Sequence, residues 1–261
     1  MHRLSLLLAL LSGTAGAQAL DVTEGTRTAE VQAFGFDYDF DDGLQQKDFN
    51  FELQGPWSAD LVGDLDDYYG FDVADARATQ VSGVAPTLLE CDLDAVTSAA
   101  GNHFLADSAA ETGYSVQFEA HEQVRYRFAA DAETVPGYNE ARVSLTREGV
   151  ALADLDVSYQ GGGDSVLQVG WLPVGEYVLD AFASSMAFGS SGQPGSAQAA
   201  VEARLEVFHA ADYDLDGAVT LFDVYAFVDD ILAGDLATDF DGDGVLTLLD
   251  WFGFRDAWLG A

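Results

Sequence analysis

Several residue types are scarce in this 261-residue sequence, and each scarcity excludes a class of protein or site. Cys91 is the single cysteine, so the chain has no internal disulfide and cannot build a zinc site on thiolates. Lys and Arg together number 10 against 45 Asp and Glu, which gives a formal net charge of −35. Nucleic acids and anionic membranes are bound mainly through Lys and Arg. The composition therefore predicts neither as a partner.

Long hydrophobic runs are also absent, and the one short run lies at the start of the chain. Residues 4–11 are apolar apart from Ser5, His2 and Arg3 form a short basic end before them, and Ala17-Gln18-Ala19 has the small-x-small form of a cleavage site. A membrane-spanning helix needs about 20 apolar residues, so this run is too short to span. We predict that residues 1–19 are a signal peptide cleaved after Ala19 and that the mature protein is secreted and soluble.

What the chain has in abundance is aspartate, and near its C-terminus the aspartates follow a repeated pattern. One copy runs from Asp212 to Asp223 and the other from Asp239 to Asp250. Both copies have Asp at positions 1, 3, 5 and 12, Gly at position 6 and Thr at position 9. Matching of so many positions indicates an internal repeat.

The spacing in each copy is that of a calcium-binding loop. Such a loop offers oxygen ligands at positions 1, 3, 5, 7, 9 and 12, with a backbone carbonyl at position 7 and a glycine at position 6 for the sharp turn. A solvated acidic turn is the alternative, but the second copy argues against it. The sequence predicts two Ca²⁺ ions, with these ligands: Asp212, Asp214, Asp216, Ala218, Thr220 and Asp223; Asp239, Asp241, Asp243, Val245, Thr247 and Asp250.

A helical pattern follows each loop, whereas a strand pattern precedes the first. Apolar residues recur at helical spacing from Leu221 to Leu232 and from Leu248 to Leu259, and Gly234 is placed to end the first helix. Residues 201–208 alternate between apolar and polar, which is typical of a strand. The helix that enters an ordinary EF-hand loop is therefore missing.

Two loop-helix units with Asp at position 12 and no entering helix resemble the dockerin family. The resemblance covers residues 209–261 and implies a small all-α calcium module in which two half EF-hands pack antiparallel. It also implies docking to a cohesin-like domain, or else an intramolecular clasp onto the rest of the chain. In that family, loop positions 10 and 11 help to select the partner. Here they are Leu221-Phe222 and Leu248-Leu249, and their apolar character predicts core residues.

The segment 20–208 has the pattern of an all-β domain. Phe34 to Phe40 and Phe49 to Leu53 alternate on either side of Asp41-Asp42-Gly43, which predicts a hairpin. After a less regular stretch at 58–108, short alternating runs are separated by Gly and Pro turns. We predict an antiparallel, jelly-roll-like β-sandwich of short strands. The runs after residue 108 are 114–118, 124–128, 143–145, 155–159, 167–171, 177–179 and 201–208.

Chemistry-bearing residues in this domain are few, and each has a structural interpretation. Residues 37–48 imitate a third calcium loop, but their aromatic residues keep strand register. His103 and His121 lie outside any catalytic motif, and we expect them to be solvated or satisfied. We expect four aromatic residues in the core rather than on a sugar-stacking platform: Trp57, Tyr68, Tyr69 and Trp171. The acidic runs 64–67 and 90–94 contain carboxylate pairs of the kind that glycosidases use, but pairs are expected by number alone among 45 acids.

The sequence thus favours a secreted, non-catalytic calcium-binding protein whose dockerin-like module docks a β-sandwich to a partner. The alternatives are a polysaccharide-degrading enzyme, either a glycoside hydrolase or a polysaccharide lyase, and a glycan-binding module. Polysaccharide is therefore a second candidate partner.

Overall fold

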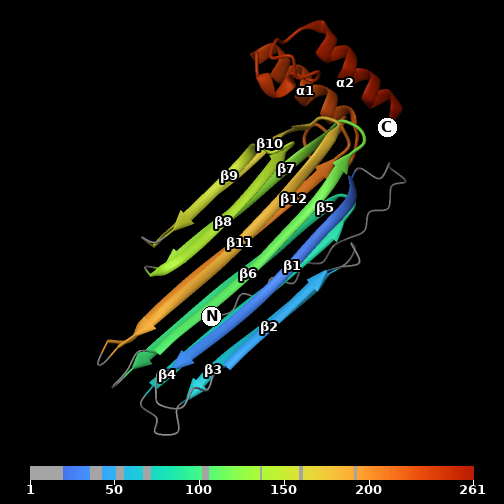
Figure 1. The fold of residues 1–261 in the computed structure, drawn as a ribbon. Coiled ribbons are helices and arrows are strands. Elements are labelled where there is room, and N and C mark those ends of the chain that lie inside the picture. The colour runs from blue at the N-terminus through green and yellow to red at the C-terminus, as the bar shows by residue number, and fades with distance from the viewer. Residues whose placement is uncertain are drawn as a thin grey trace.

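The computed structural model describes residues 20–35, 43–50, 56–66, 72–101, 106–135, 137–158, 161–190 and 193–261. These residues form long strands followed by a small helical part at one end of the molecule (Figure 1). No helix among them is long and apolar enough to cross a membrane. The strands are β1 (Leu20–Gly35), β2 (Gly43–Asn50), β3 (Trp57–Asp66), β4 (Asp72–Ala85), β5 (Leu88–Gly101), β6 (Ala106–Ala120), β7 (Val124–Val135), β8 (Tyr138–Arg147), β9 (Val150–Ser158), β10 (Gly162–Leu172), β11 (Gly175–Gly189) and β12 (Gly195–Phe208).

The strands form two six-stranded antiparallel sheets that share one core. Sheet A has the order β2-β1-β6-β11-β8-β9, and sheet B has the order β10-β7-β12-β5-β4-β3. Consecutive strands from β5 to β8 alternate between the two sheets, so neighbours within a sheet come from distant parts of the sequence. The prediction of a mainly β, antiparallel, sandwich-like fold is confirmed.

Side-chain alternation along the strands places one face of each sheet in the core. The ring of Phe118 on β6 stacks on that of Tyr177 on β11, with centroids 5.3 Å apart. On β4 and β5 alanine occupies several of the buried positions, including Ala76, Ala78 and Ala95. Cys91 is buried among them as a free thiol, and burial raises its pKa far above the usual range.

Each strand predicted after residue 108 is present, and the turns at Glu148-Gly149 and at 173–175 separate strands as expected. The prediction that the strands are short is wrong, since β1 has 16 residues and β6 and β11 have 15 each. The stretch 58–108 contains three strands, β3, β4 and β5, which the sequence pattern did not indicate. On β4 the buried residues before Val84 are alanines, Gln80 and Ser82, which contrast weakly with the polar residues between them.

Strands β1 and β2 pair antiparallel, but Ala33 lies opposite Gly43, so Gly43 belongs to β2 and not to the predicted turn at 41–43. The predicted strand at 34–40 lies mostly outside the described residues. Several other expectations lie outside the described residues. These are the signal peptide at 1–19, the start of the third loop-like run at 37–42, the acid at Asp67, and the side chains of Tyr68, Tyr69 and His103.

The helical part follows β12 without an entering helix, as predicted. It contains α1 (Leu221–Ala233), the 3₁₀ helix η1 (Leu236–Thr238) and α2 (Leu248–Gly260). Thr220 and Thr247 cap α1 and α2, and each forms a capping box with the aspartate three residues later. Gly234 ends α1 in the left-handed conformation, with φ of 76°.

Candidate functional site

The first loop gathers three carboxylates around its own backbone. Asp212, Asp214 and Asp216 place oxygen atoms within 4.8 Å of one another. Asp212 accepts hydrogen bonds from the N–H of Asp216 at 3.2 Å and of Gly217 at 3.0 Å. Gly217 has a φ of 90°, a conformation that favours glycine and lets the chain turn sharply around the carboxylates.

The second loop repeats this arrangement nearly atom for atom. Asp239, Asp241 and Asp243 also lie within 4.8 Å of one another. Asp239 accepts from the N–H of Asp243 at 3.2 Å and of Gly244 at 2.7 Å, and Gly244 has a φ of 82°. Two loops with one hydrogen-bond pattern are the structural counterpart of the sequence repeat.

The aspartate at position 12 closes each loop onto its helix. Asp223 accepts from the N–H of Tyr213 at 2.7 Å with one oxygen and from the N–H of Thr220 at 2.6 Å with the other. Asp250 does the same with Phe240 at 2.8 Å and Thr247 at 2.7 Å. Both aspartates are fully buried. The short side chain at position 12 therefore joins the start of the loop to the first turn of the helix.

Like charges held this close perturb one another. Burial, together with the nearby carboxylate of Asp223, raises the pKa of Asp212 to about 6. Partial desolvation and neighbouring carboxylates also raise the pKa values of Asp214 and Asp241. Burial alone would raise the pKa of Asp250 as well, but backbone N–H donors outweigh it and lower that pKa. The loops are thus electrostatically costly at neutral pH unless a cation balances them.

The geometry fits a hard cation such as Ca²⁺, which prefers several oxygen ligands on a flexible loop. Of the predicted ligands, the structure brings the aspartates at positions 1, 3 and 5 together in each loop. Thr220 and Thr247 sit at the helix starts, and Ala218 and Val245 donate their N–H groups to Asp216 and Asp243, each at 2.8 Å. Ligation by these four residues and by the position-12 aspartates stays a prediction.

The two loop-helix units pack on each other through an aromatic cluster. Phe227 of α1 stacks on Phe254 of α2 with centroids 4.1 Å apart, and Tyr213 meets both rings edge-on. Trp258 donates its indole N–H to the carbonyl of Thr220 at 3.0 Å, which ties the end of α2 to the first loop. Because of these contacts, we expect a structural change in one loop to affect the stability of the other.

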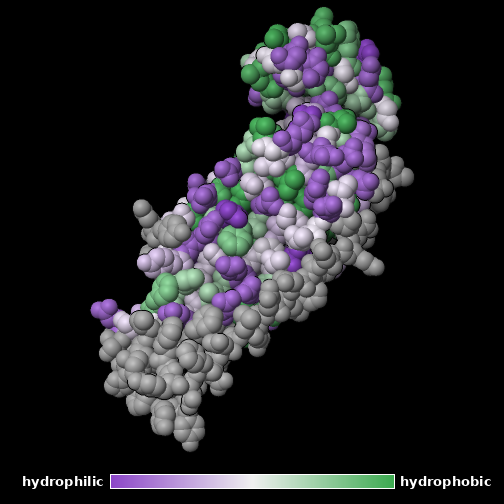
Figure 2. All heavy atoms as spheres, viewed as in Figure 1, coloured by the Kyte–Doolittle hydropathy of each residue, from purple (hydrophilic) through white to green (hydrophobic). Residues whose placement is uncertain are grey.

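The apolar residues at loop positions 10 and 11 are exposed, so their prediction as core residues is wrong. Leu221, Phe222, Leu248 and Leu249 have 60–72 % of their surface accessible. The helices instead bury Phe227 and Phe254, the residues nearest the partner helix. Figure 2 shows hydrophobic residues along the outer margin of this helical part, beside hydrophilic ones.

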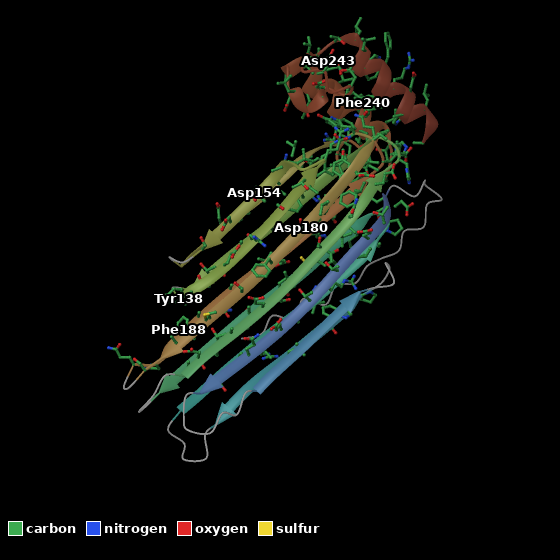
Figure 3. The ribbon with its side chains drawn as sticks, in the orientation of Figure 1. Tyr138, Asp154, Asp180, Phe188, Phe240 and Asp243 are labelled. Carbon is green, nitrogen blue, oxygen red and sulfur yellow. The ribbon has the colours of Figure 1, made fainter. Side chains whose placement is uncertain are left out.

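The helical part also contacts the end of the sandwich. An intramolecular clasp is one of the two expectations that the resemblance implies, but no sequence pattern indicates the residues that make the contact. Trp171 of β10 donates its indole N–H to the carbonyl of Ala237 at 3.0 Å, and its ring packs edge-on against Phe240 at 4.8 Å. Gln123, just before β7, donates to the carbonyl of Phe240. Figure 3 places Phe240 at this junction and Asp243 farther out.

Arg125 of β7 is the charged centre of the contact. Its guanidinium carbon lies 4.5 Å from the ring centroids of both Trp171 and Tyr213. The side chain is 3 % exposed, donates to the carbonyl of Tyr213 at 3.4 Å, and burial lowers its pKa. Since Tyr213 directly follows the first ligand position, Arg125 joins the sandwich to the first loop.

The other candidates in the sandwich have structural partners. Trp57 is partly buried against the core, as expected, whereas Trp171 packs on the helical part and corrects its assignment to the core of the sandwich. Glu90 lies 3.8 Å from Arg204, and Asp94 accepts from Gln198 at 3.3 Å. His121 is exposed between Asp21 and Glu119, in line with a solvated histidine.

Comparisons with known proteins place the chain in no family. No family model matches the sequence, and no curated protein matches it. Three solved structures share 8–9 % identity with it, at TM-scores that carry no argument about function. They are the enzymatically active domain of bacteriophage CBA120 tailspike protein 4 (9 % identity, TM-score 0.23, 60 % of this chain and 19 % of that one), TmCBM61 in complex with β-1,4-galactotriose (9 %, 0.21, 59 % and 89 %) and infectious bursal disease virus Gt strain (8 %, 0.22, 77 % and 74 %). The chain thus spans about a fifth of the tailspike protein's length.

Proposed function

We propose that this chain is a secreted calcium-binding protein in which two Ca²⁺ ions organise a dockerin-like helical module, residues 209–261. The observation that carries the proposal is the pair of loops, which share one pattern of carboxylates, backbone hydrogen bonds and capping boxes. The module has twelve aspartates, and Arg255 is its one Lys or Arg residue, so its net charge is strongly negative. Two divalent ions would neutralise part of this charge and reduce the repulsion between the carboxylates.

The sandwich, in this proposal, is a jelly roll with an N-terminal addition. Eight strands, β5 to β12, support this interpretation: they have the order β5-β12-β7-β10 in one sheet and β6-β11-β8-β9 in the other. As in a jelly roll, the last strand, β12, lies between β5 and β7, and the one before it, β11, lies between β6 and β8. Strands β1 to β4 extend both sheets at the opposite edge.

The module has two sides with different uses. One side is fixed to the sandwich through Trp171 and Arg125, which supports an intramolecular clasp. The module also exposes Leu221, Phe222 and their counterparts in the second unit, on a segment that carries twelve aspartates. Charge complementarity calls for a partner with an apolar centre and a basic rim, and we propose a cohesin-like domain of that kind.

Calorimetry with Ca²⁺ tests the calcium step on the full chain. We expect two ions to bind, and Asp214→Ala with Asp241→Ala to remove most of the binding heat, because each substitution deletes a charged ligand. Asp229→Ala is the matched control, since it removes an exposed aspartate of α1 outside both loops. No heat from the unaltered chain, or equal loss in the control, would contradict the proposal.

A further inference from the structure

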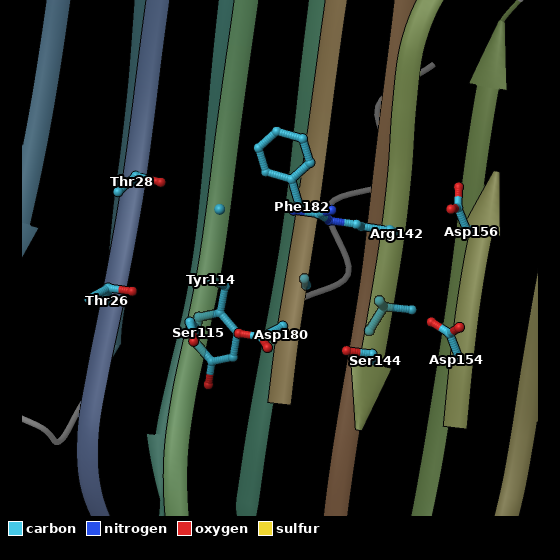
Figure 4. Close-up of a pocket in the computed structure, with 13 residues that line it drawn as sticks. Thr26, Thr28, Tyr114, Ser115, Arg142, Ser144, Asp154, Asp156, Asp180 and Phe182 are labelled. Carbon is cyan, nitrogen blue, oxygen red and sulfur yellow. The ribbon is translucent and has the colours of Figure 1, made fainter. Parts of the chain in front are cut away.

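A hollow of about 600 Å³ lies on the outer face of sheet A (Figure 4). It crosses β1, β6, β11, β8 and β9, and Figure 3 shows two of its residues, Asp154 and Asp180, on the strands and apart from the helical module. Five strands at a spacing of about 4.8 Å give the hollow a span of about 19 Å. This length suits an extended chain lying across the strands rather than a single small molecule.

The strand register sets the lining residues in two rows across the sheet. One row is Thr26, Ser115, Asp180, Ser144 and Asp154, and the next is Thr28, Gly113, Phe182, Arg142 and Asp156. The first row consists of hydroxyls and carboxylates alone. The second places an aromatic ring and a guanidinium in the middle.

Gly113 shapes the floor of the hollow. A Cβ at this position would lie 2.9 Å from the hydroxyl oxygen of Thr28 and 3.8 Å from the ring of Phe182. Glycine therefore leaves room beside the ring, which stays partly exposed and is seen face-on in Figure 4. The guanidinium of Arg142 lies 4.9 Å from the ring centroid and 3.2 Å from Glu140, so its position is held from two directions.

The three carboxylates of the hollow are free to bind a ligand. Asp154, Asp156 and Asp180 are exposed, and within the described part of the chain they take part in no hydrogen bond or ion pair. Asp154 and Asp180 are separated by the strand of Ser144, so their backbones are about 10 Å apart. That separation is too large for one metal ion, and the metal-capable acidic clusters of the described residues lie in the two loops instead.

We propose that this hollow binds a neutral oligosaccharide chain. The ring of Phe182 contacts the apolar C–H face of one sugar, Asp154 and Asp180 accept hydrogen bonds from sugar hydroxyls, and Arg142 donates to sugar oxygens. Three carboxylates against one guanidinium repel anionic polysaccharides, phosphates and nucleic acids. The proposal does not rest on calcium binding, because the site and the loops share no residue.

Affinity electrophoresis and calorimetry of the full chain test the proposal, with soluble glucan, xylan and mannan as neutral probes and polygalacturonate as the anionic probe. We expect at least one neutral polysaccharide to bind and polygalacturonate not to bind. Phe182→Ala should weaken binding at least about tenfold, because the ring supplies most of the apolar contact. Phe188→Ala is the matched control, since Phe188 is an exposed phenylalanine of the same strand outside the hollow.

Asp180→Asn is a second variant that keeps both volume and fold, because this side chain is exposed. We expect it to weaken binding several-fold with an unchanged melting temperature. The proposal is overturned if no neutral probe binds, if polygalacturonate binds better, or if Phe182→Ala and Phe188→Ala have equal effects.

Discussion

At the scale of single residues, Asp212 best reports the electrostatic cost of the loops. Its pKa is raised to about 6 in the folded chain, above the ordinary value of 3.8. A raised carboxyl pKa means that the folded state binds the proton more tightly than the unfolded state. Without calcium, the free energy of unfolding should therefore increase as the pH falls from 7 to 5, and this gain should be lost as the pH rises through 6.

The variant Asp212→Asn distinguishes the effect of protonating Asp212 from the effect of protonating the other carboxylates at low pH. In chelator at pH 7 the variant should melt at a higher temperature than the unaltered chain, because it removes a buried repulsive charge. In calcium it should melt at a lower temperature, because it removes a ligand charge. Thermal melts at pH 5 and 7 in both buffers test the reversal, and a change of the same sign in both buffers would contradict it.

At the scale of elements, Arg125 decides how β7 meets the helical module. Its guanidinium carbon lies 4.5 Å from the ring centroids of both Trp171 and Tyr213, and the nearby charges are those of Asp212, Asp230 and Asp235. A desolvated cation–π contact is worth about 2 kcal/mol, which outweighs the apolar packing that methionine would retain. We expect Arg125→Met to speed proteolysis at residues 209–211 about tenfold or more, as the module opens more often.

Arg127→Met is the control for this experiment. Arg127 lies on the same strand and face, but its ion pair with Glu206 at 2.6 Å is partly exposed. Such pairs contribute at most about 1 kcal/mol. Mass spectrometry of the digests should show little change in the cleavage rate for this variant. Equal cleavage rates for the two variants would contradict the role of Arg125 in holding the module to the sandwich.

The elements that sequence predicts well here are those set by neighbouring residues. The helical stripes that begin at Leu221 and Leu248 and the stop at Gly234 depend on spacings of one to four residues, and the structure has α1, α2 and this stop. Strand β4 escaped prediction because alanines, Gln80 and Ser82 at its buried positions hide the alternation. The exposure of Phe222 was not predicted, because apolar residues at helical spacing do not determine how wide the buried face of the helix is.

At the scale of the whole molecule, the sites arise from contacts that no local pattern encodes. The hollow on sheet A needs Thr26, Ser115, Asp180 and Asp154 in register across strands far apart in the sequence. The junction likewise joins Arg125 and Trp171 to Tyr213 across the chain. Sequence therefore predicts the loops as a candidate site and an intramolecular clasp as one alternative for docking, but it predicts neither the hollow nor the residues of the junction.

The two parts of the molecule should respond differently to loss of calcium. The sandwich has a large hydrophobic core of its own. The core of the module is small, and its buried residues are Ala211, Tyr213, Phe227 and Phe254. At a free calcium concentration one hundred times Kd, each ion stabilises the folded module by about 2.7 kcal/mol. Chelation should remove this stabilisation from the module alone.

Hydrogen exchange measured by mass spectrometry, with and without EDTA, tests this difference. We expect amides of α1 and α2 to lose protection in EDTA while those of β6, β11 and β12 keep it. Because the stacked rings of Phe227 and Phe254 join the two loops, Asp241→Ala alone should also deprotect α1 in calcium, and Asp229→Ala should not. Uniform protection of both parts in EDTA would show that the ions do not hold the module together.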